Sequence, residues 1–596
     1  MKLIEALRII RAEMPKENKS VRVSLVCGFT PLHLKTLLAA HLRLLFPHLR
    51  IDIETGIYGD LLGNLKHLDS NTLSGAAVVV EWTDLDPRLG IRHLGGWGPK
   101  DLKDIIEHVR AQCLLLGEAA EHCALHFPLA VCLPTLPLPP ASFTAGWQAG
   151  AFDLELRDAS NRLATRLGRT SGCRLANCQY LDRHSPPDDR WDVKADLLSG
   201  FPYAVSHADV MAHVLAQLLA NPLPKKGLIT DLDDTLWSGI LGEVGVHGIS
   251  WDLDHGSQMH GVYQQLLNAI SQEGVLVAVA SKNNPALVQE ALRREDLLLS
   301  LDRVFPFAVH WGPKSESVTT ILQTWNVAAD SVVFVDDSPM ELAEVGMAHP
   351  GLQCLHFPKN DWGAIERLLG QLRDLFGKTA LSAEDALRMD SLRIAAHLRE
   401  TAVGPANSPD QFLQQAEAEI TLSFGKEPLD PRALELVNKT NQFNLNGKRY
   451  TETSWSTYLK DPRVFLLLGS YRDKYGPLGK ITVLTGRLEG ATLQVDTWVM
   501  SCRAFVRRIE HKCLEQLFSK FEVKEIRFQF LPTERNEPLQ RFFTEFLGQP
   551  PQEEFVLSRQ LFMEKCPPLF HCIKETKAWM MPESASSSVS RRCSRI

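Results

Sequence analysis

The sequence predicts a multidomain α/β protein, because apolar runs of strand length alternate with helix-length segments along most of the chain. The alternation is clear over residues 21–135 and starts afresh near residue 225. Strands that alternate with helices in this way are typical of βαβ units around a parallel sheet. The chain has 596 residues. At about 150 residues per domain, that length suggests about four domains.

The expected strands and helices follow from these apolar runs in chain order. In the first unit the pattern predicts strands and intervening helices at 21–29, 31–46, 49–56, 76–82, 101–127 and 129–134. The second unit is expected to have strands at 227–230, 275–281, 303–310 and 331–337. The third mixes strands with one long helix, at 464–471, 478–490, 491–500, 504–521 and 524–531. We therefore expect an α/β domain at 1–220, a second at 221–361, a helical linker at 362–418, a third α/β domain at 419–565, and a tail at 566–596 with a disordered end.

The composition excludes several classes of protein. Hydrophobic residues make up 44% and charged residues 23%, which is ordinary globular usage and excludes a wholly disordered or fibrous chain. There are 64 Lys and Arg against 71 Asp and Glu, a net charge of −7, which disfavours a nucleic-acid partner. The twelve cysteines form no CxxC pair and no zinc spacing, so free thiols in a reducing compartment are favoured.

The sequence gives no sign of membrane association. The first twenty residues carry charges throughout and have no apolar core of the kind found in signal peptides. The most apolar stretch, residues 125–140, holds five prolines, and a spanning helix needs about 20 largely apolar residues. We therefore expect a cytoplasmic protein with no membrane partner.

The strongest chemical signal is a pair of carboxylates after a buried strand. The apolar run 227–230 is followed by Asp231 and Asp233. In an open parallel sheet this position faces the crevice where ligands bind. Carboxylates at i and i+2 point to the same side and can share a divalent cation.

Matching polar groups recur after the later strands of the same unit. Ser281 ends the next apolar strand, and Lys314 stands just before a helix. The strand 331–337 ends in Asp336 and Asp337, with Glu341 four residues further on. In this order the groups resemble the four motifs of the haloacid-dehalogenase-like (HAD) superfamily.

The resemblance implies a Rossmannoid core that transfers phosphoryl groups. It implies that Asp231 is the nucleophile and Asp233 the general acid and base, with Ser281 and Lys314 holding phosphoryl oxygens. It also implies Mg²⁺ as the cofactor, bound by Asp231, the backbone carbonyl of Asp233 and Asp337. Asp336 and Glu341 would lie behind the metal ligands and orient them. The substrate would contact Thr235, Lys282 and Asn283. The alternative is a fold that has kept its carboxylates without activity.

Further blocks resemble a narrower family, the FkbH-like HAD proteins. They are the short segment after the first motif and the stretches 436–451, 496–510 and 531–543. The resemblance implies a degenerate SGNH-like domain before the HAD core and a GNAT-like acyltransferase domain after it. It further implies loading of a glyceryl unit from 1,3-bisphosphoglycerate onto the phosphopantetheine arm of an acyl carrier protein, for polyketide-type biosynthesis. The alternatives are a stand-alone HAD phosphatase acting on a small-molecule or protein-bound phosphate, and a non-catalytic scaffold in a synthase complex.

In the third domain, Cys502 is the candidate acyl-carrying thiol. It opens a predicted helix beside Arg503, and both a helix start and a nearby cation stabilise a thiolate. A packed core thiol, or a residue that only flanks the pantetheine pocket, is the alternative. Nearby, three polar side chains are candidates for binding a glyceryl or pantetheine group, although turn chemistry explains them equally well: Asn441, Gln442 and Asn444.

Two departures from the family patterns affect these expectations. Val506 and Arg508 stand where GNAT pyrophosphate loops often have glycine, so ordinary coenzyme A binding is in doubt. We expect the side chains of Arg507 and Arg508 to contact a phosphate instead. His511 is a candidate base, but we favour a surface position for it.

In the first domain, Cys27 stands where SGNH hydrolases have their serine, and His207 is a possible remnant of their histidine. We favour carrier docking or scaffolding over catalysis for that domain.

Overall fold

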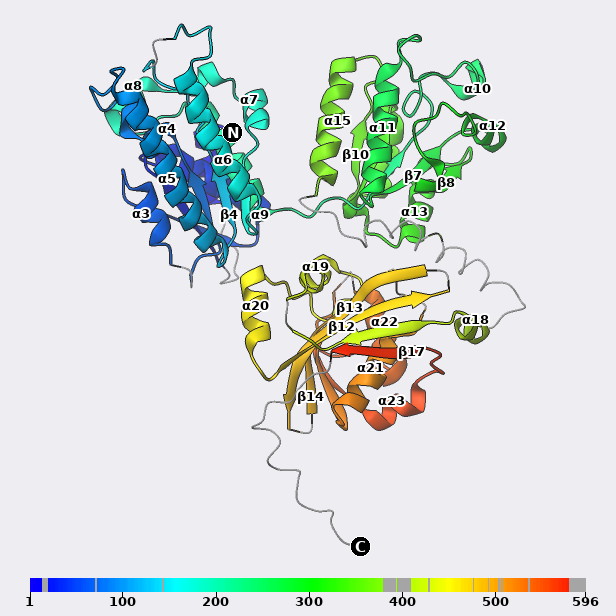
Figure 1. Ribbon diagram of the computed structural model, residues 1–596. Coiled ribbons are helices and arrows are strands. Elements are labelled where there is room, and N and C mark those ends of the chain that lie inside the picture. Colours follow the sequence, from blue (N-terminus) through cyan, green and yellow to red (C-terminus); the bar gives the residue numbers. More distant parts are fainter. Residues whose placement is uncertain are drawn as a thin grey trace, which may run out of the picture. The chain divides into compact units, whose positions relative to one another are not determined.

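The strands of the described residues form three separate sheets, one in each predicted α/β domain (Figure 1). The computed structural model describes residues 1–577 apart from 13–19, 70–71, 142–143, 379–392, 394–408, 427–428, 475, 491, 502–503, 505–506 and 534–535. The chain divides near Pro222 into two compact units. Within the described residues, no helix has the length and apolar character needed to cross a membrane.

The first unit is built on a parallel sheet in the order β2-β1-β3-β4-β5. The strands are β1 (Ser20–Cys27), β2 (Arg50–Thr55), β3 (Gly75–Val79), β4 (Leu129–Cys132) and β5 (Cys173–Leu175). Along β3 successive residues alternate between two cores: Ala76 and Val78 pack on one side, Ala77 and Val79 on the other. The sheet is therefore buried on both faces, as parallel sheets usually are.

Helices cover both faces of this sheet. The core that contains Val78 also takes in α5 and α6, whereas the core that contains Val79 takes in α2 and α9. The helices of the unit are α1 (Leu3–Arg11), α2 (Leu32–Leu45), α3 (Leu61–Lys66), α4 (Trp82–Leu85), α5 (Asp101–Ala124), α6 (Ala151–Gly168), α7 (Cys178–His184), α8 (Val193–Ser199) and α9 (Val205–Ala220).

The second sheet is also parallel, in the order β10-β9-β6-β7-β8. Its strands are β6 (Gly227–Thr230), β7 (Leu276–Ser281), β8 (Val304–Val309), β9 (Val332–Asp336) and β10 (Gln353–His356). The helices around it are α10 (Leu241–Val244), α11 (Gln258–Gln272), α12 (Pro285–Ala291), α13 (Lys314–Trp325), α14 (Pro339–Ala348) and α15 (Trp362–Phe376). In β6, Leu228 packs on the side of α11 and Ile229 on the side of α13. The predicted Rossmann-like core is confirmed.

The third sheet is mixed, in the order β16-β15-β14-β13-β12-β11-β17. Its strands are β11 (Glu419–Ser423), β12 (Val464–Asp473), β13 (Gly476–Glu489), β14 (Thr492–Met500), β15 (Glu525–Gln529), β16 (Glu554–Ser558) and β17 (Cys572–Lys577). The helices are α18 (Pro409–Gln415), α19 (Pro431–Lys439), α20 (Glu452–Lys460), α21 (Ile509–Lys520), α22 (Glu537–Leu547) and α23 (Arg559–Lys565). Most neighbouring strands are antiparallel, but β14 is parallel to β15 and β11 is parallel to β17.

The structure differs from two predicted domain boundaries. Helix α15, placed in a linker from the sequence, buries Ile365 and Leu372 in the core of the second sheet and lies beside α11 in Figure 1. Strand β17, placed in the tail, pairs with β11. A helix or strand at a domain edge carries the same local pattern whether or not it packs on the domain, so the sequence did not distinguish these cases.

Replacing Leu372 by Ala tests the place of α15. The side chain is fully buried. Because the truncation leaves a cavity, we expect the free energy of unfolding of the second domain to fall by about 3 kcal/mol. Chemical denaturation measures it, with Arg367→Ala on the exposed side of the same helix as control. Equal stability of the two variants would mean that α15 is a linker.

Candidate active site

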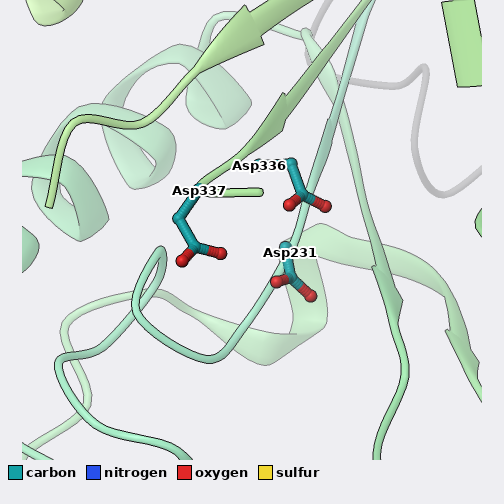
Figure 2. A group of neighbouring side chains, drawn as sticks. All are labelled: Asp231, Asp336 and Asp337. Carbon is teal, nitrogen blue, oxygen red and sulfur yellow. The ribbon is translucent and has the colours of Figure 1, made fainter. Parts of the chain in front are cut away.

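Three carboxylates meet at the carboxyl ends of the neighbouring strands β6 and β9 (Figure 2). One oxygen from each of Asp231, Asp336 and Asp337 lies within 4.8 Å of the others. The backbone dictates this arrangement, because Thr230 pairs with Val335 and the Asp231 N–H donates to the Val335 carbonyl at 3.0 Å. The next residue of each strand is therefore an aspartate at the same edge of the sheet.

Lys314, the first residue of α13, lies between two of these carboxylates. Its Nζ is 2.6 Å from Asp336 Oδ2 and 3.0 Å from Asp231 Oδ1, and all three side chains are buried. Burial raises the pKa of Asp231, against the opposing charge of Lys314. Burial, and then the charge of Asp231, raises the pKa of Asp336 to about 6. Burial works against the charged form of Lys314, but the two carboxylates outweigh it and hold the lysine pKa above its ordinary value.

The carboxylate group fits a hard divalent cation. The oxygen ligands are of the kind that Mg²⁺ prefers. Asp231 Oδ1 is buried and, despite its contact with Lys314, has no hydrogen bond of good geometry to any described residue. Asp336 differs, because its two oxygens accept from Lys314 and from the Ser338 N–H. Asp231 and Asp337 therefore have more oxygen capacity left for a metal than Asp336.

Asp233 lies outside this group and is held by three donors. Its Oδ1 accepts from Trp237 Nε1 at 3.0 Å and from the Leu241 N–H at 3.2 Å, and its Oδ2 accepts from Asn283 Nδ2 at 2.9 Å. Burial raises the pKa of Asp233, and the neighbouring aspartates raise it further. A carboxyl group with a raised pKa and a fixed direction is suited to carrying a proton.

The other predicted site residues lie around the same strand ends. Ser281, the last residue of β7, is buried, and its hydroxyl opposes the burial that raises the pKa of Asp231. Lys282 Nζ is 2.7 Å from Glu341 Oε1, so Glu341 positions this lysine. Thr235 is fully buried, and its hydroxyl makes no hydrogen bond within the described part of the chain.

One residue of this site was missed from the sequence. Lys359 follows β10, and its Nζ lies 2.7 Å from Asp234 Oδ2 and 2.9 Å from Asp337 Oδ2. Asp234 has a left-handed backbone, with φ of 52°, and accepts from the Gly239 N–H. Lys359 therefore ties the loop after β6 to the end of β9. The strand before it, β10, was not among the predicted strands, so the rule that located the aspartates gave no signal for Lys359.

In the third domain, the predicted thiol and phosphate-binding residues fall in the segment that leads into α21. Cys502, Arg503 and Val506 lie outside the described residues. Of the two arginines expected to meet a phosphate, Arg507 is buried beside Asp473, and Arg508 forms an ion pair with Asp410 at 2.5 Å.

The polar residues expected to bind ligand in this domain are partly used by the fold. Asn444 Nδ2 donates to the Thr440 carbonyl, and Asn444 Oδ1 accepts from the N–H groups of Asn446 and Gly447. Asn441 accepts from Arg449. Gln442 lies beside them in the same segment. The hydrogen bonds of Asn444 and Asn441 therefore stabilise the turns of their own segment.

The segment Phe443–Asn446 lies between two strands of the third sheet. β14 and β15 pair only over Thr492–Val495. Beyond that point, Phe443 accepts from the Met500 N–H, and the Leu445 N–H donates to Trp498. The Leu445 carbonyl accepts from the Leu531 N–H, and Asn446 donates to a carbonyl on each strand. The gap between the two strands is thus bridged by the chain itself.

Two further expectations change. His511, expected on the surface, is buried against the rings of Phe542 and Phe546. His207, a possible catalytic remnant, is fully buried and bonded to Thr135 and Ser185.

The thiol of the first domain does not form a catalytic pair. Cys27 donates to the Phe29 carbonyl, and burial raises its pKa to about 12. Burial also lowers the pKa of His207 to about 3. A neutral thiol and a histidine bonded elsewhere do not make a nucleophile and base.

Comparison with known proteins shows the fold. No protein-family model and no curated protein matches the chain. Among solved structures, the N-terminal part of the protein BF1531 from Bacteroides fragilis, described as containing a phosphatase domain complexed with Mg, is 18% identical with a TM-score of 0.52. The match covers 64% of this chain and 100% of that one. At this identity the likeness establishes the shared α/β fold alone.

Two weaker likenesses carry no argument. An uncharacterized protein from Corynebacterium glutamicum is 18% identical over 26% of this chain and 98% of its own, with a TM-score of 0.19. A dinucleotide-forming acetyl-coenzyme A synthetase 1 from Ca. Korarchaeum cryptofilum is 12% identical over 62% and 69%, with a TM-score of 0.18.

Replacing Lys359 by Met tests its role at the carboxylate group. Asp234 and Asp337 would lose their shared cation, so in chelator we expect stability to fall by about 1 kcal/mol. Added Mg²⁺ should stabilise the variant more than the wild type, because no ammonium group would then compete for Asp337. Thermal unfolding with and without Mg²⁺ measures this, and Lys359→Arg is the charge-preserving control. Equal gains from Mg²⁺ in all three proteins would contradict the role.

Proposed function

We propose that the second domain is a Mg²⁺-dependent phosphatase of the HAD type. The observation that carries the proposal is the group of Asp231, Asp336 and Asp337 around the buried ammonium of Lys314, at the ligand-binding edge of a parallel sheet. The similar protein from Bacteroides fragilis, described as containing a phosphatase domain complexed with Mg, supports the same chemistry.

In the proposed reaction, Asp231 attacks the phosphorus of a phosphate monoester. A bond forms between phosphorus and Asp231, and the bond from phosphorus to the substrate oxygen breaks. Asp233 donates its proton to that leaving oxygen. Asp233 then takes a proton from water, whose oxygen attacks phosphorus, so that inorganic phosphate leaves and Asp231 is restored.

The surrounding groups stabilise charge in these steps. Lys314, which contacts Asp231, and Ser281, at the end of the adjacent strand β7, would bind phosphoryl oxygens as negative charge develops on them. Mg²⁺, held by Asp231, the backbone carbonyl of Asp233 and Asp337, would neutralise the phosphoryl group. The fixed direction of Asp233, set by Trp237 and Asn283, keeps the proton near the leaving oxygen.

We further propose that this phosphatase acts with glyceryl transfer from 1,3-bisphosphoglycerate to an acyl carrier protein. One structural observation favours a large substrate: the only helix between β6 and α11, a segment described throughout, is the four-residue α10, so this segment does not insert a cap domain. In the transfer step a thiolate attacks the acyl carbon, a C–S bond forms, the C–O bond to phosphate breaks and inorganic phosphate leaves. Cys502 is proposed as that thiol from the sequence alone.

Replacing Asp231 by Asn tests the nucleophile. An amide cannot form the aspartyl-phosphate, so phosphate release from an aryl phosphate should fall at least about a thousandfold. The matched control is Asp302→Asn, an exposed carboxylate in the turn before β8 that lies outside the carboxylate group. Release of phosphate by the Asp231 variant at the control rate would remove Asp231 from the mechanism.

Intact-mass spectrometry of a holo acyl carrier protein tests the transfer. The carrier is incubated with the chain, Mg²⁺ and 1,3-bisphosphoglycerate, and we expect a glyceryl adduct on the pantetheine thiol. Phosphate release without an adduct would support a stand-alone phosphatase instead. Neither product would support a non-catalytic scaffold.

A further inference from the structure

The first unit contains a cavity of about 440 Å³ that none of the proposed chemistry uses. Its walls include residues from the loops that follow β1, β2, β3 and β4, among them Gly28, Tyr58, Asp84 and Leu136. The sheet order β2-β1-β3 places β2 and β3 on opposite sides of β1, which makes this edge the switch point of the sheet. Parallel sheets bind ligands in such crevices, and the volume is that of a small-molecule site.

Asp84 carries the chemistry of this cavity. Its Oδ2 accepts from the Glu81 N–H at 2.8 Å, and no described residue donates to its Oδ1. Oδ1 lies directly over Gly28, where a Cβ atom would be only 1.8 Å away. Glycine at this position therefore leaves room for a carboxylate oxygen with unused hydrogen-bonding capacity.

The charges around Asp84 favour a cation. Glu81, Asp60 and Asp84 line the cavity, and no described basic side chain forms an ion pair with any of the three. The lining includes the guanidinium of Arg92, which is paired with Asp196 and lies 5.9 Å from the centroid of the Tyr58 ring. Glu81 accepts from the neutral groups of Thr135, Leu136 and Tyr203.

The remaining titratable groups do not change this balance. Of the two histidines in the lining, His108 is bonded to Asp86, and His93 lies on an exposed loop. Burial, opposed only by the Glu81 N–H and reinforced by the Glu81 charge, raises the pKa of Asp84 to about 7. A positively charged ligand would relieve this repulsion, whereas phosphates and carboxylates would add to it.

Aromatic side chains form part of the wall. Phe29, Tyr58, Trp82 and Trp191 line the cavity. The Trp82 N–H donates to the Leu136 carbonyl and the Trp191 N–H to Asp196, so both polar edges are already bonded. Aromatic rings beside a carboxylate suit an organic cation.

We propose that this cavity is a binding site for a small molecule that carries an ammonium group, which bonds to Asp84 Oδ1 between the aromatic walls. The site is independent of the phosphatase chemistry at Asp231. Anionic metabolites, including phosphate esters, are excluded from it by the same charges.

Calorimetric titration of the full chain tests the proposal with three probes of matched shape: benzylammonium, benzyl alcohol and benzoate. We expect benzylammonium to bind, benzyl alcohol to bind more weakly and benzoate not to bind. In Asp84→Asn the affinity for benzylammonium should fall about tenfold or more, because a charged hydrogen bond is lost. Gly28→Ala should lower the affinity for benzylammonium similarly, because its Cβ would displace the Asp84 carboxylate without removing it.

The control is Asp158→Asn, an exposed carboxylate on α6 that pairs with Arg162 and lines no part of this cavity. It should bind benzylammonium like the wild type, and all three variants should keep wild-type phosphate release, which separates this site from the proposed phosphatase. Absence of benzylammonium binding, equal binding of benzoate, or unchanged affinity in Asp84→Asn would each overturn the proposal.

Discussion

The Lys314 ammonium, buried between Asp231 and Asp336, is the group on which the carboxylate cluster of the second domain depends. Two carboxylates at adjacent strand ends cannot both stay charged away from water unless a cation lies close to them. Lys314 supplies that cation from the first turn of α13, so the packing of α13 against the sheet sets the position of the charge. Removing Lys314 or its carboxylate partners would leave a buried charge uncompensated. The stability of the core and the geometry of the site therefore depend on the same ion contacts.

A second cation works at the rim of the same site. Lys359 contacts Asp337 and Asp234 where the side chains are partly exposed, so its interactions are weaker than those of Lys314. The two lysines have different roles. The buried Lys314 holds Asp231 and Asp336 together, and the more exposed Lys359 connects the loop after β6 to the end of β9.

The sequence predicted the central fold and most of this site because both follow from local patterns. Continuous apolar strands predict a parallel sheet, and residues such as Asp231 and Asp336 are brought together by strand pairing alone. Lys359 and the α15 boundary depend on which distant segments pack together, and that information is not local. His511 illustrates the same limit, since a polar residue in a helix gives no sign that Phe542 and Phe546 will cover it.

The segment Phe443–Asn446 limits how an extended ligand could bind between β14 and β15. It bonds to both β14 and β15, and Asn446 alone reaches a carbonyl on each. Because the segment belongs to the same chain, its effective concentration at the gap is of the order of millimolar or higher, and dilution does not reduce it. An extended ligand that bound the same backbone groups would therefore compete with this segment of the protein itself. Its apparent affinity would be reduced by the fraction of time that the segment occupies the gap.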